Sequence, residues 1–113
     1  MEDLNSVNLI GRVTRDTELR YTNGGTATCT ATIAVNRRRK VNDQWQDEAS
    51  FIDIQLWGKP AEGLASRLTR GVQIAVTGSL RQEKWEQNGE TKTKLLVVAS
   101  QIQLFNREVS NGF

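Results

Sequence analysis

The chain has 113 residues, which suits one domain, and its 15 Lys and Arg against 13 Asp and Glu leave a formal net charge of only +2 at pH 7. The sequence contains no His and a single Cys, Cys29, which excludes His-based catalytic pairs, a cysteine metal cluster and an intrachain disulfide. No apolar run approaches the ~20 residues that span a bilayer, and the acidic start MEDLNSVNL is unlike a secretory signal, so we expect a cytosolic protein.

Two segments in the first third of the chain alternate between apolar and polar residues, a pattern typical of half-buried strands. In Ser6 to Val13 the odd-numbered residues form the apolar face. After a turn signal at Asn23-Gly24-Gly25, the segment Thr26 to Val35 places its odd-numbered residues on an apolar face and Thr on the other. Cys29 lies on the apolar face, which favours a packed thiol over a reactive one.

The next segment, Asn36 to Ser50, is polar and charged, and we predict a long hairpin loop that carries Trp45. A third strand follows at Phe51 to Trp57, with Ile52, Ile54 and Leu56 forming its apolar face. The opposite face holds two large aromatic side chains, Phe51 and Trp57, with an Asp and a Gln between them. Large aromatics on a polar strand face indicate either a binding surface or an interface.

A short helix is predicted after the third strand. Pro60 suits the first helical turn, and Gly71 suits the position just past the end. Ala61, Leu64, Ala65 and Leu68 recur between them at helical spacing, which predicts an amphipathic helix of about ten residues.

The last third of the chain predicts a second hairpin. Alternation resumes at Val72 and continues to Arg81, and Asn88-Gly89 is a strong signal for a tight turn. The return strand is predicted from Thr91 to Val98, with Ile102 to Leu104 extending its ladder. If the register holds beyond Leu80, Trp85 falls on the polar face of this hairpin.

Five strands with one short helix between the third and the fourth predict an all-β fold. The specific expectation is a five-stranded OB-fold barrel with extended hairpins. We assign residues 1–107 to this domain. Residues 108–113 are expected to form a short flexible end with no acidic tail.

Aromatic and basic residues together predict a surface for single-stranded nucleic acid, because bases stack on flat π surfaces while phosphates require cations. Alternatively, the aromatics pack under loops or in an oligomer interface, and the charge run is a solvated surface. Trp45 either stacks on a base or supports its hairpin. The candidate contacts are the aromatics Phe51, Trp57, Trp85 and Trp45, the run Arg37, Arg38, Arg39 and Lys40, and the cations Arg20, Lys59, Arg81 and Lys84.

Catalytic patterns are weak. Glu83 and Glu86 are three residues apart and therefore face opposite ways on a strand, so they form no carboxylate pair. Gly24-Gly25 lacks the downstream Lys of a phosphate-binding loop. We expect no enzyme activity, no catalytic residue, no cofactor and no metal.

Several blocks, in the correct order over about Ser6 to Arg107, resemble the bacterial single-stranded-DNA-binding protein family. The resemblance implies an OB-fold, a homotetramer, and single-stranded DNA wrapped over the assembly in DNA replication, recombination and repair. It also implies a bacterial, nucleoid-associated protein. The blocks are Val7 to Arg12, Asp16 to Tyr21, Ile33 to Arg37, Phe51 to Gly58, and Gly78 to Arg81 leading to Lys84-Trp85.

The resemblance implies base stacking on Phe51, Trp57 and Trp85. It places Arg39 at a position where members often carry a stacking aromatic, and Thr17 where they usually have Pro. Full-length members usually end in a linker and an acidic tip that recruits replication and repair enzymes. This sequence ends at Ser110 to Phe113 with neither, which fits a tailless member or the core of a longer one and leaves enzyme recruitment open.

Two alternative functions remain. A related replication-restart OB protein resembles the same family and also lacks a tail, but it is a dimer. The other alternative is a protein-interaction OB module whose aromatics are interface residues. Three stacking positions favour the single-strand binder over the replication-restart protein, and quenching of Trp fluorescence by oligo-dT would exclude the interaction module.

Overall fold

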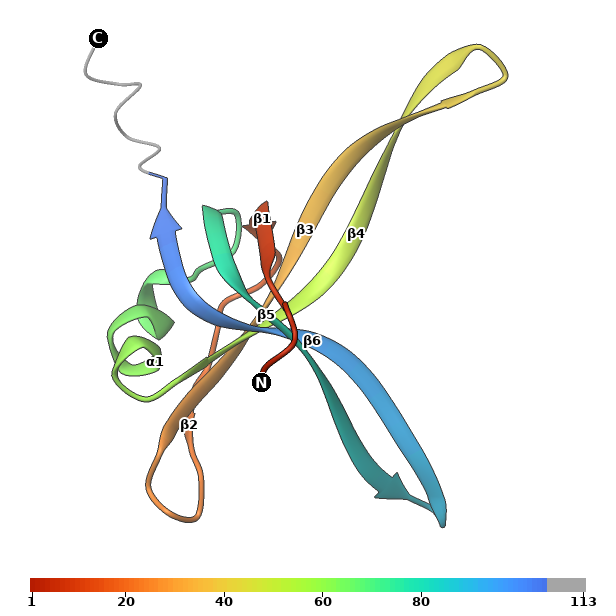
Figure 1. The fold of residues 1–113 in the computed structure, drawn as a ribbon. Coiled ribbons are helices and arrows are strands. Elements are labelled where there is room, and N and C mark those ends of the chain that lie inside the picture. The colour runs from red at the N-terminus through yellow and green to blue at the C-terminus, as the bar shows by residue number, and fades with distance from the viewer. Residues whose placement is uncertain (106–113) are drawn as a thin grey trace, which may run out of the picture.

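The computed structural model describes residues 1–105, and Figure 1 shows their course. The predicted flexible end at 108–113 and the last two residues of the predicted domain lie outside the described residues. The elements are β1 (Val7–Val13), β2 (Leu19–Tyr21), β3 (Ala27–Val41), β4 (Gln44–Trp57), α1 (Lys59–Leu64), a 3-10 turn (Ala65–Arg67), β5 (Gln73–Gln87) and β6 (Glu90–Leu104).

Five of the strands close into a barrel. The sheet order is β1-β5-β6-β4-β3-β2, and an additional pairing of β1 with β3 joins the two ends of the five-stranded part. Four of the five seams are antiparallel, and the fifth is the parallel pairing of Ile54 and Gln55 in β4 with Val97 and Val98 in β6. The predicted five-stranded barrel is confirmed.

The barrel core follows the alternation of the sequence. The odd-numbered residues of β3 from Ala27 to Ile33 are buried, and so are Ile54 and Leu56 of β4. The helical segment covers one end of the barrel, where Ala61, Ala65 and Leu68 are buried in the same cluster. Burial raises the pKa of the Cys29 thiol, which keeps it a neutral core side chain.

The prediction of a loop from Asn36 to Ser50 is wrong. β3 and β4 pair without interruption from Thr28 opposite Trp57 to Val41 opposite Gln44. A two-residue turn at Asn42 and Asp43 joins them, and both residues have positive φ, as a type I′ turn requires. Polar residues line both faces of this arm, so no hydrophobic alternation marks its strands. The basic run therefore lies on β3, and Trp45 lies on β4 rather than on a loop.

The helix is shorter than predicted. α1 spans six residues from Lys59 to Leu64, and a 3-10 turn continues it to Arg67. Gly63 lies inside the segment and weakens an α-helix because of its backbone freedom. Ala65 in the 3-10 turn and Leu68 just after it are nevertheless buried, so the helical spacing of the apolar residues correctly predicted which of them face the core. The short strand β2 has no counterpart among the predicted elements. All three of its residues are exposed, so no alternation of apolar and polar residues marks it as a strand.

The second hairpin is confirmed, including the extension from Ile102 to Leu104. Asn88 and Gly89 both have positive φ at its turn. The register shifts between Thr77 and Gly78, which bends the strand pair as a β-bulge does. Figure 1 shows the β3–β4 and β5–β6 hairpins projecting from the barrel in different directions. Within residues 1–105, no helix has the length and apolar character needed to cross a membrane.

Candidate nucleic-acid interface

The outer face of β4 carries the aromatic residues that the sequence singled out. Ile54 and Leu56 point into the core, so Phe51 and Trp57 lie on the opposite face. Phe51 is 68% exposed, whereas Trp57 is half-buried. Thr28 of β3 lies directly opposite Trp57, so a β-branched polar side chain borders the ring.

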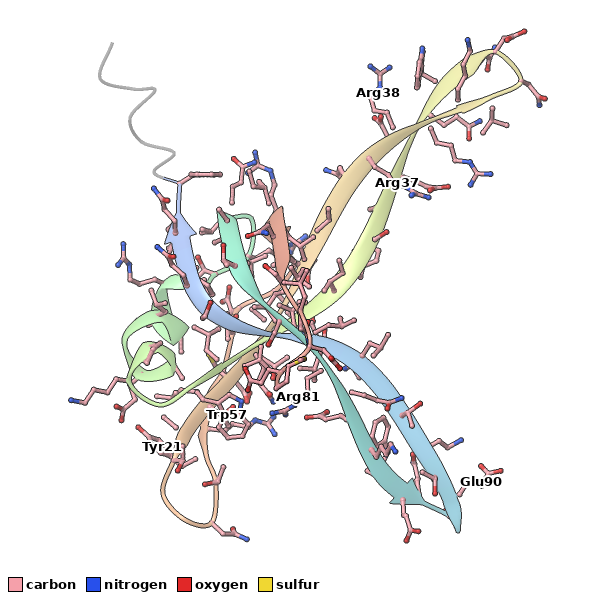
Figure 2. The ribbon with its side chains drawn as sticks, viewed as in Figure 1. Tyr21, Arg37, Arg38, Trp57, Arg81 and Glu90 are labelled. Carbon is pink, nitrogen blue, oxygen red and sulfur yellow. The ribbon has the colours of Figure 1, made fainter. Side chains whose placement is uncertain are left out.

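Trp57 is held by a small network that joins β4 to β5. Its Nε1 donates a hydrogen bond of 2.9 Å to Oε1 of Gln55, and the guanidinium of Arg81 donates one of 2.8 Å to the same oxygen. The Arg81 guanidinium carbon lies 5.9 Å from the centre of the Trp57 ring, which is cation–π distance. Figure 2 labels Trp57 and Arg81, which lie near the barrel end of the β5–β6 hairpin. The guanidinium thus lies over the aromatic ring, which places a cation and a flat π surface at the same point.

An acidic residue, Asp53, lies between the two aromatic positions of β4. Its carboxylate pairs with Lys94 of β6 and accepts a hydrogen bond of 2.6 Å from the Thr32 hydroxyl. Partial burial opposes ionisation, but the hydrogen bonds from Lys94 and Thr32 outweigh it and hold the pKa of Asp53 below its ordinary value. The carboxylate is therefore charged at neutral pH, and Lys94 neutralises it.

A groove runs beside this pair. Its volume is about 560 Å³, and β2, β3 and the segment before β2 form its walls. Three cations and three carboxylates line it, so its charge is balanced rather than strongly positive. The charged lining residues are Arg15, Arg20, Lys94, Asp16, Glu18 and Asp53.

Trp85 lies on the β5–β6 hairpin and is 42% exposed. It shares a shallow hollow with Glu83, Lys84 and Lys94. Lys94 thus borders both the groove beside Asp53 and the hollow beside Trp85. This residue connects the two aromatic regions, and sequence reasoning missed it because its position depends on the parallel pairing of β4 with β6.

The run of four cations on β3 is divided between the two faces of the β3–β4 arm. Arg37 and Arg39 lie on one face, where each donates a hydrogen bond of 2.9 Å to Glu48. Hydrogen bonds from these two guanidinium groups lower the pKa of Glu48. Both arginines are therefore partly neutralised by one carboxylate.

The other face of the arm carries Trp45, which is 59% exposed. The Arg38 guanidinium carbon lies 5.3 Å from its ring centre and the Lys40 ammonium 6.0 Å, while Arg38 also pairs with Asp47 at 3.8 Å. Figure 2 labels Arg37 and Arg38 on this arm. Trp45 packs against the cations of its own arm, as a side chain that supports the hairpin would. More than half of its surface is nevertheless exposed, so it is also accessible for stacking on a base.

The remaining predicted cations are more scattered. Arg20 pairs with Glu18 at 3.3 Å on the rim of the groove. Lys84 is exposed and borders the hollow of Trp85. Lys59 is exposed at the start of α1, two residues after Trp57. The structure thus gathers most of the predicted residues on β4 and the two arms, with Arg20 on β2 and Lys59 on α1.

The chain matches the single-strand binding protein family over residues 4–105. A single-stranded DNA-binding protein of Treponema pallidum (strain Nichols) is 48% identical over 104 residues, which make up 92% of this chain and 59% of the relative. One from Borreliella burgdorferi is 41% identical over 108 residues, covering 94% of this chain and 72% of the relative. This chain therefore spans less than two thirds of the Treponema relative's length.

Solved structures show the same fold. A deletion mutant of the single-stranded DNA binding protein from Thermus aquaticus superposes with a TM-score of 0.82 and 32% identity, over 93% of this chain and 52% of that one. A Plasmodium falciparum protein in complex with single-stranded DNA superposes with a TM-score of 0.83 and 23% identity, over 94% of this chain and 98% of that one. The latter likeness supports the OB-fold barrel alone.

Proposed function

The chain belongs to the single-strand binding protein family, and on that premise we propose that it binds single-stranded DNA without sequence preference. The observation that carries the proposal is the outer face of β4, where Phe51 is largely exposed and Trp57 lies beneath the Arg81 guanidinium. A strand of DNA laid along this face would stack bases on the rings and place phosphates near the cations. The family is one of binding proteins, in line with the expected absence of catalysis.

The physical basis for sequence tolerance is that every base has a π face. Stacking on Phe51, Trp57 and Trp85 reads this face and ignores the pattern of donors and acceptors on base edges. Arg38, Lys40 and Arg81 supply charge for the backbone. In a duplex the faces of the bases are stacked on one another and are not accessible. Only the phosphates of a duplex can therefore contact the aromatic and cationic face of the protein.

The proposal is tested by titrating the protein's Trp fluorescence with four ligands of equal length. Oligo-dT and a mixed-sequence single strand are expected to bind with similar affinity, and the corresponding duplex far more weakly. The affinity for an RNA strand of the same length, compared with that for the DNA strand, shows whether the protein prefers deoxyribose or ribose. Equal affinity for duplex DNA would contradict the proposal, and the absence of any DNA-dependent quenching would favour the protein-interaction module.

We further propose that the protein assembles as a homotetramer, as the family resemblance implies. The aliphatic side chain of Ile10 on the outer face of β1 is 53% exposed, which leaves apolar surface for a subunit contact. The pairs of Val7 through Gly11 are all with β5, so this part of β1 has a second edge available. Light scattering at micromolar concentration is expected to give the mass of four chains. The mass of two would favour the replication-restart alternative, and that of one would contradict assembly.

The division of the basic run yields a prediction about salt dependence. Replacing Arg38 and Lys40 with Ala is expected to weaken binding at every sequence. It is expected to flatten the slope of log K against log salt by up to about 1.4, because each phosphate neutralised on a single strand contributes about 0.7. Replacing Arg37 and Arg39 is expected to change the slope less, because Glu48 lies 2.9 Å from both of them, whereas Asp47 on the other face lies 3.8 Å from Arg38 alone.

The measurement is the affinity for oligo-dT at several salt concentrations for both double variants and for the variant lacking all four cations. Arg67→Ala, which removes an exposed cation from the 3-10 turn, is the matched control. An unchanged slope in the variant lacking all four cations would make the run an ordinary solvated surface. Equal effects of the two double variants would show that DNA contacts both faces of the arm.

In the cell, we propose that this binding protects and organises single strands during DNA replication, recombination and repair. We propose that the protein acts in the bacterial cytoplasm, where it is associated with the nucleoid. The support is family membership together with the aromatic and cationic face described above. DNA and further copies of the same chain are the proposed partners.

A further inference from the structure

A buried carboxamide lies in the middle of the outer face of β4. Gln55 is 7% exposed, although its neighbours on this face in sequence, Asp53 and Trp57, are only partly buried. Burying a polar side chain is unfavourable unless its hydrogen-bonding groups are satisfied. The buried Gln55 side chain therefore needs hydrogen-bonding partners, and the identity of those partners indicates its role.

Both lone pairs of the Gln55 carbonyl oxygen are used. Trp57 Nε1 donates to this oxygen at 2.9 Å, and Arg81 donates to it at 2.8 Å. A carboxamide oxygen accepts two hydrogen bonds, so Gln55 Oε1 is saturated by these two donors. One atom thus links an aromatic residue of β4 with a cation of β5.

The link fixes the relative placement of the ring and the cation. The Arg81 guanidinium carbon lies 5.9 Å from the centre of the Trp57 ring, and a second interaction of Arg81 with Glu83 at 3.6 Å anchors it from β5. Trp57 and Arg81 are labelled together in Figure 2. Neither side chain needs to be ordered by a ligand, because both are already restrained through Gln55.

We infer that Gln55 is a positioning residue, which holds Trp57 and Arg81 as one preformed contact for a base and its adjoining phosphate. The inference rests on the proposed binding of single-stranded DNA. Ordering a flexible side chain opposes binding, and restraint before binding removes that cost. Gln55 therefore acts through its two partners rather than by touching DNA.

Two substitutions separate positioning from packing. Gln55→Met keeps a side chain of similar length and volume but removes the acceptor, so it tests the hydrogen bonds. Gln55→Glu keeps the acceptor and adds a charge. Thermal unfolding of each variant shows whether it folds, and affinities are compared per folded molecule.

The binding test compares Gln55→Met in the wild-type chain and in a chain that lacks both partners, Trp57→Ala with Arg81→Ala. In the wild-type chain it is expected to weaken oligo-dT binding about threefold to tenfold, the range set by ordering one side chain. In the chain that lacks both partners the same substitution is expected to change affinity by less than about twofold, because no side chain remains for Gln55 to position. An equal loss in both chains would overturn the inference and assign Gln55 a direct contact with DNA. No loss in the wild-type chain would also overturn it.

A second test uses the DNA-free protein. The indole N–H resonance of Trp57, assigned with Trp57→Phe, is expected to exchange faster with solvent in Gln55→Met and to stay protected in Gln55→Glu. Unchanged protection in Gln55→Met would overturn the positioning role. If the wild-type chain fails to bind oligo-dT, the proposed function fails, and the indole measurement still decides whether Gln55 holds Trp57.

Discussion

Replacing Trp85 with Ala is expected to lower the affinity for oligo-dT by about 1–3 kcal/mol, the value of one base stacked on an aromatic residue in proteins that bind single strands. Phe51→Ala is expected to have an effect of the same size. The two side chains are 42% and 68% exposed, so neither carries much of the core. The free energy of unfolding is expected to change by no more than about 0.5 kcal/mol in either variant.

Trp57 differs from these two residues because it is half-buried and hydrogen-bonded to Gln55. Trp57→Ala is expected to weaken binding by about 1–3 kcal/mol as well. It is also expected to lower stability, though by less than the roughly 3–5 kcal/mol that a fully buried aromatic contributes. The interaction with Arg81 is lost in the same variant.

The measurement is a denaturation midpoint and an oligo-dT affinity on each of the three variants. Tyr21→Phe is a matched control, since it changes an exposed aromatic side chain by one hydroxyl group that bonds to Glu62 at 3.4 Å. A large loss of stability with unchanged affinity per folded molecule would show that the residue in question packs the barrel. It would then not contact DNA.

Replacing Ile54 with Ala is expected to destabilise the protein by about 2–5 kcal/mol, the usual cost of removing a large aliphatic side chain from a core. Ile54 is 0% exposed and lies on β4 between Ala31 of β3 and Val97 of β6. Its truncation leaves a cavity at the parallel seam between β4 and β6. The affinity of the molecules that remain folded is expected to stay the same.

The comparison with Phe51→Ala is the decisive one, because both residues lie on β4 three positions apart and face opposite ways. Urea unfolding and oligo-dT binding are expected to give reversed patterns: lost stability at position 54 and lost affinity at position 51. A loss of less than about 1 kcal/mol of stability for Ile54→Ala would contradict the assignment of this face to the core.

The local sequence determined which face of each barrel strand is buried. Alternation along β3 and β4 placed Cys29 and Ile54 inside and Phe51 outside, because successive side chains of a strand point to opposite faces. Asn88-Gly89 determined the second turn, since both of its residues adopt the positive φ that a two-residue hairpin needs. The prediction of an OB-fold followed from these elements and the position of the helix.

Alternation carried no information along the β3–β4 arm. Its residues are polar on both faces, so hydrophobic periodicity could not distinguish a paired strand from a loop. The structure there is a continuous backbone ladder closed by the turn at Asn42 and Asp43. Across this ladder, Arg37 and Arg39 pair with Glu48, and Arg38 lies over Trp45. The sequence therefore located four adjacent cations, and only their pairing showed that two of them share a carboxylate.

The tertiary structure alone decided which distant residues meet at the candidate interface. Lys94 reaches Asp53, and Arg81 reaches Gln55, because β6 lies beside β4 and β5 beside β6 in the closed barrel. Strand order depends on long-range pairing, and residue periodicity does not encode it. The sequence by itself thus determined which strand face carries the aromatic residues. The order of the strands in the barrel determined that Gln55 and Arg81 meet at Trp57 and that Lys94 borders the hollow of Trp85.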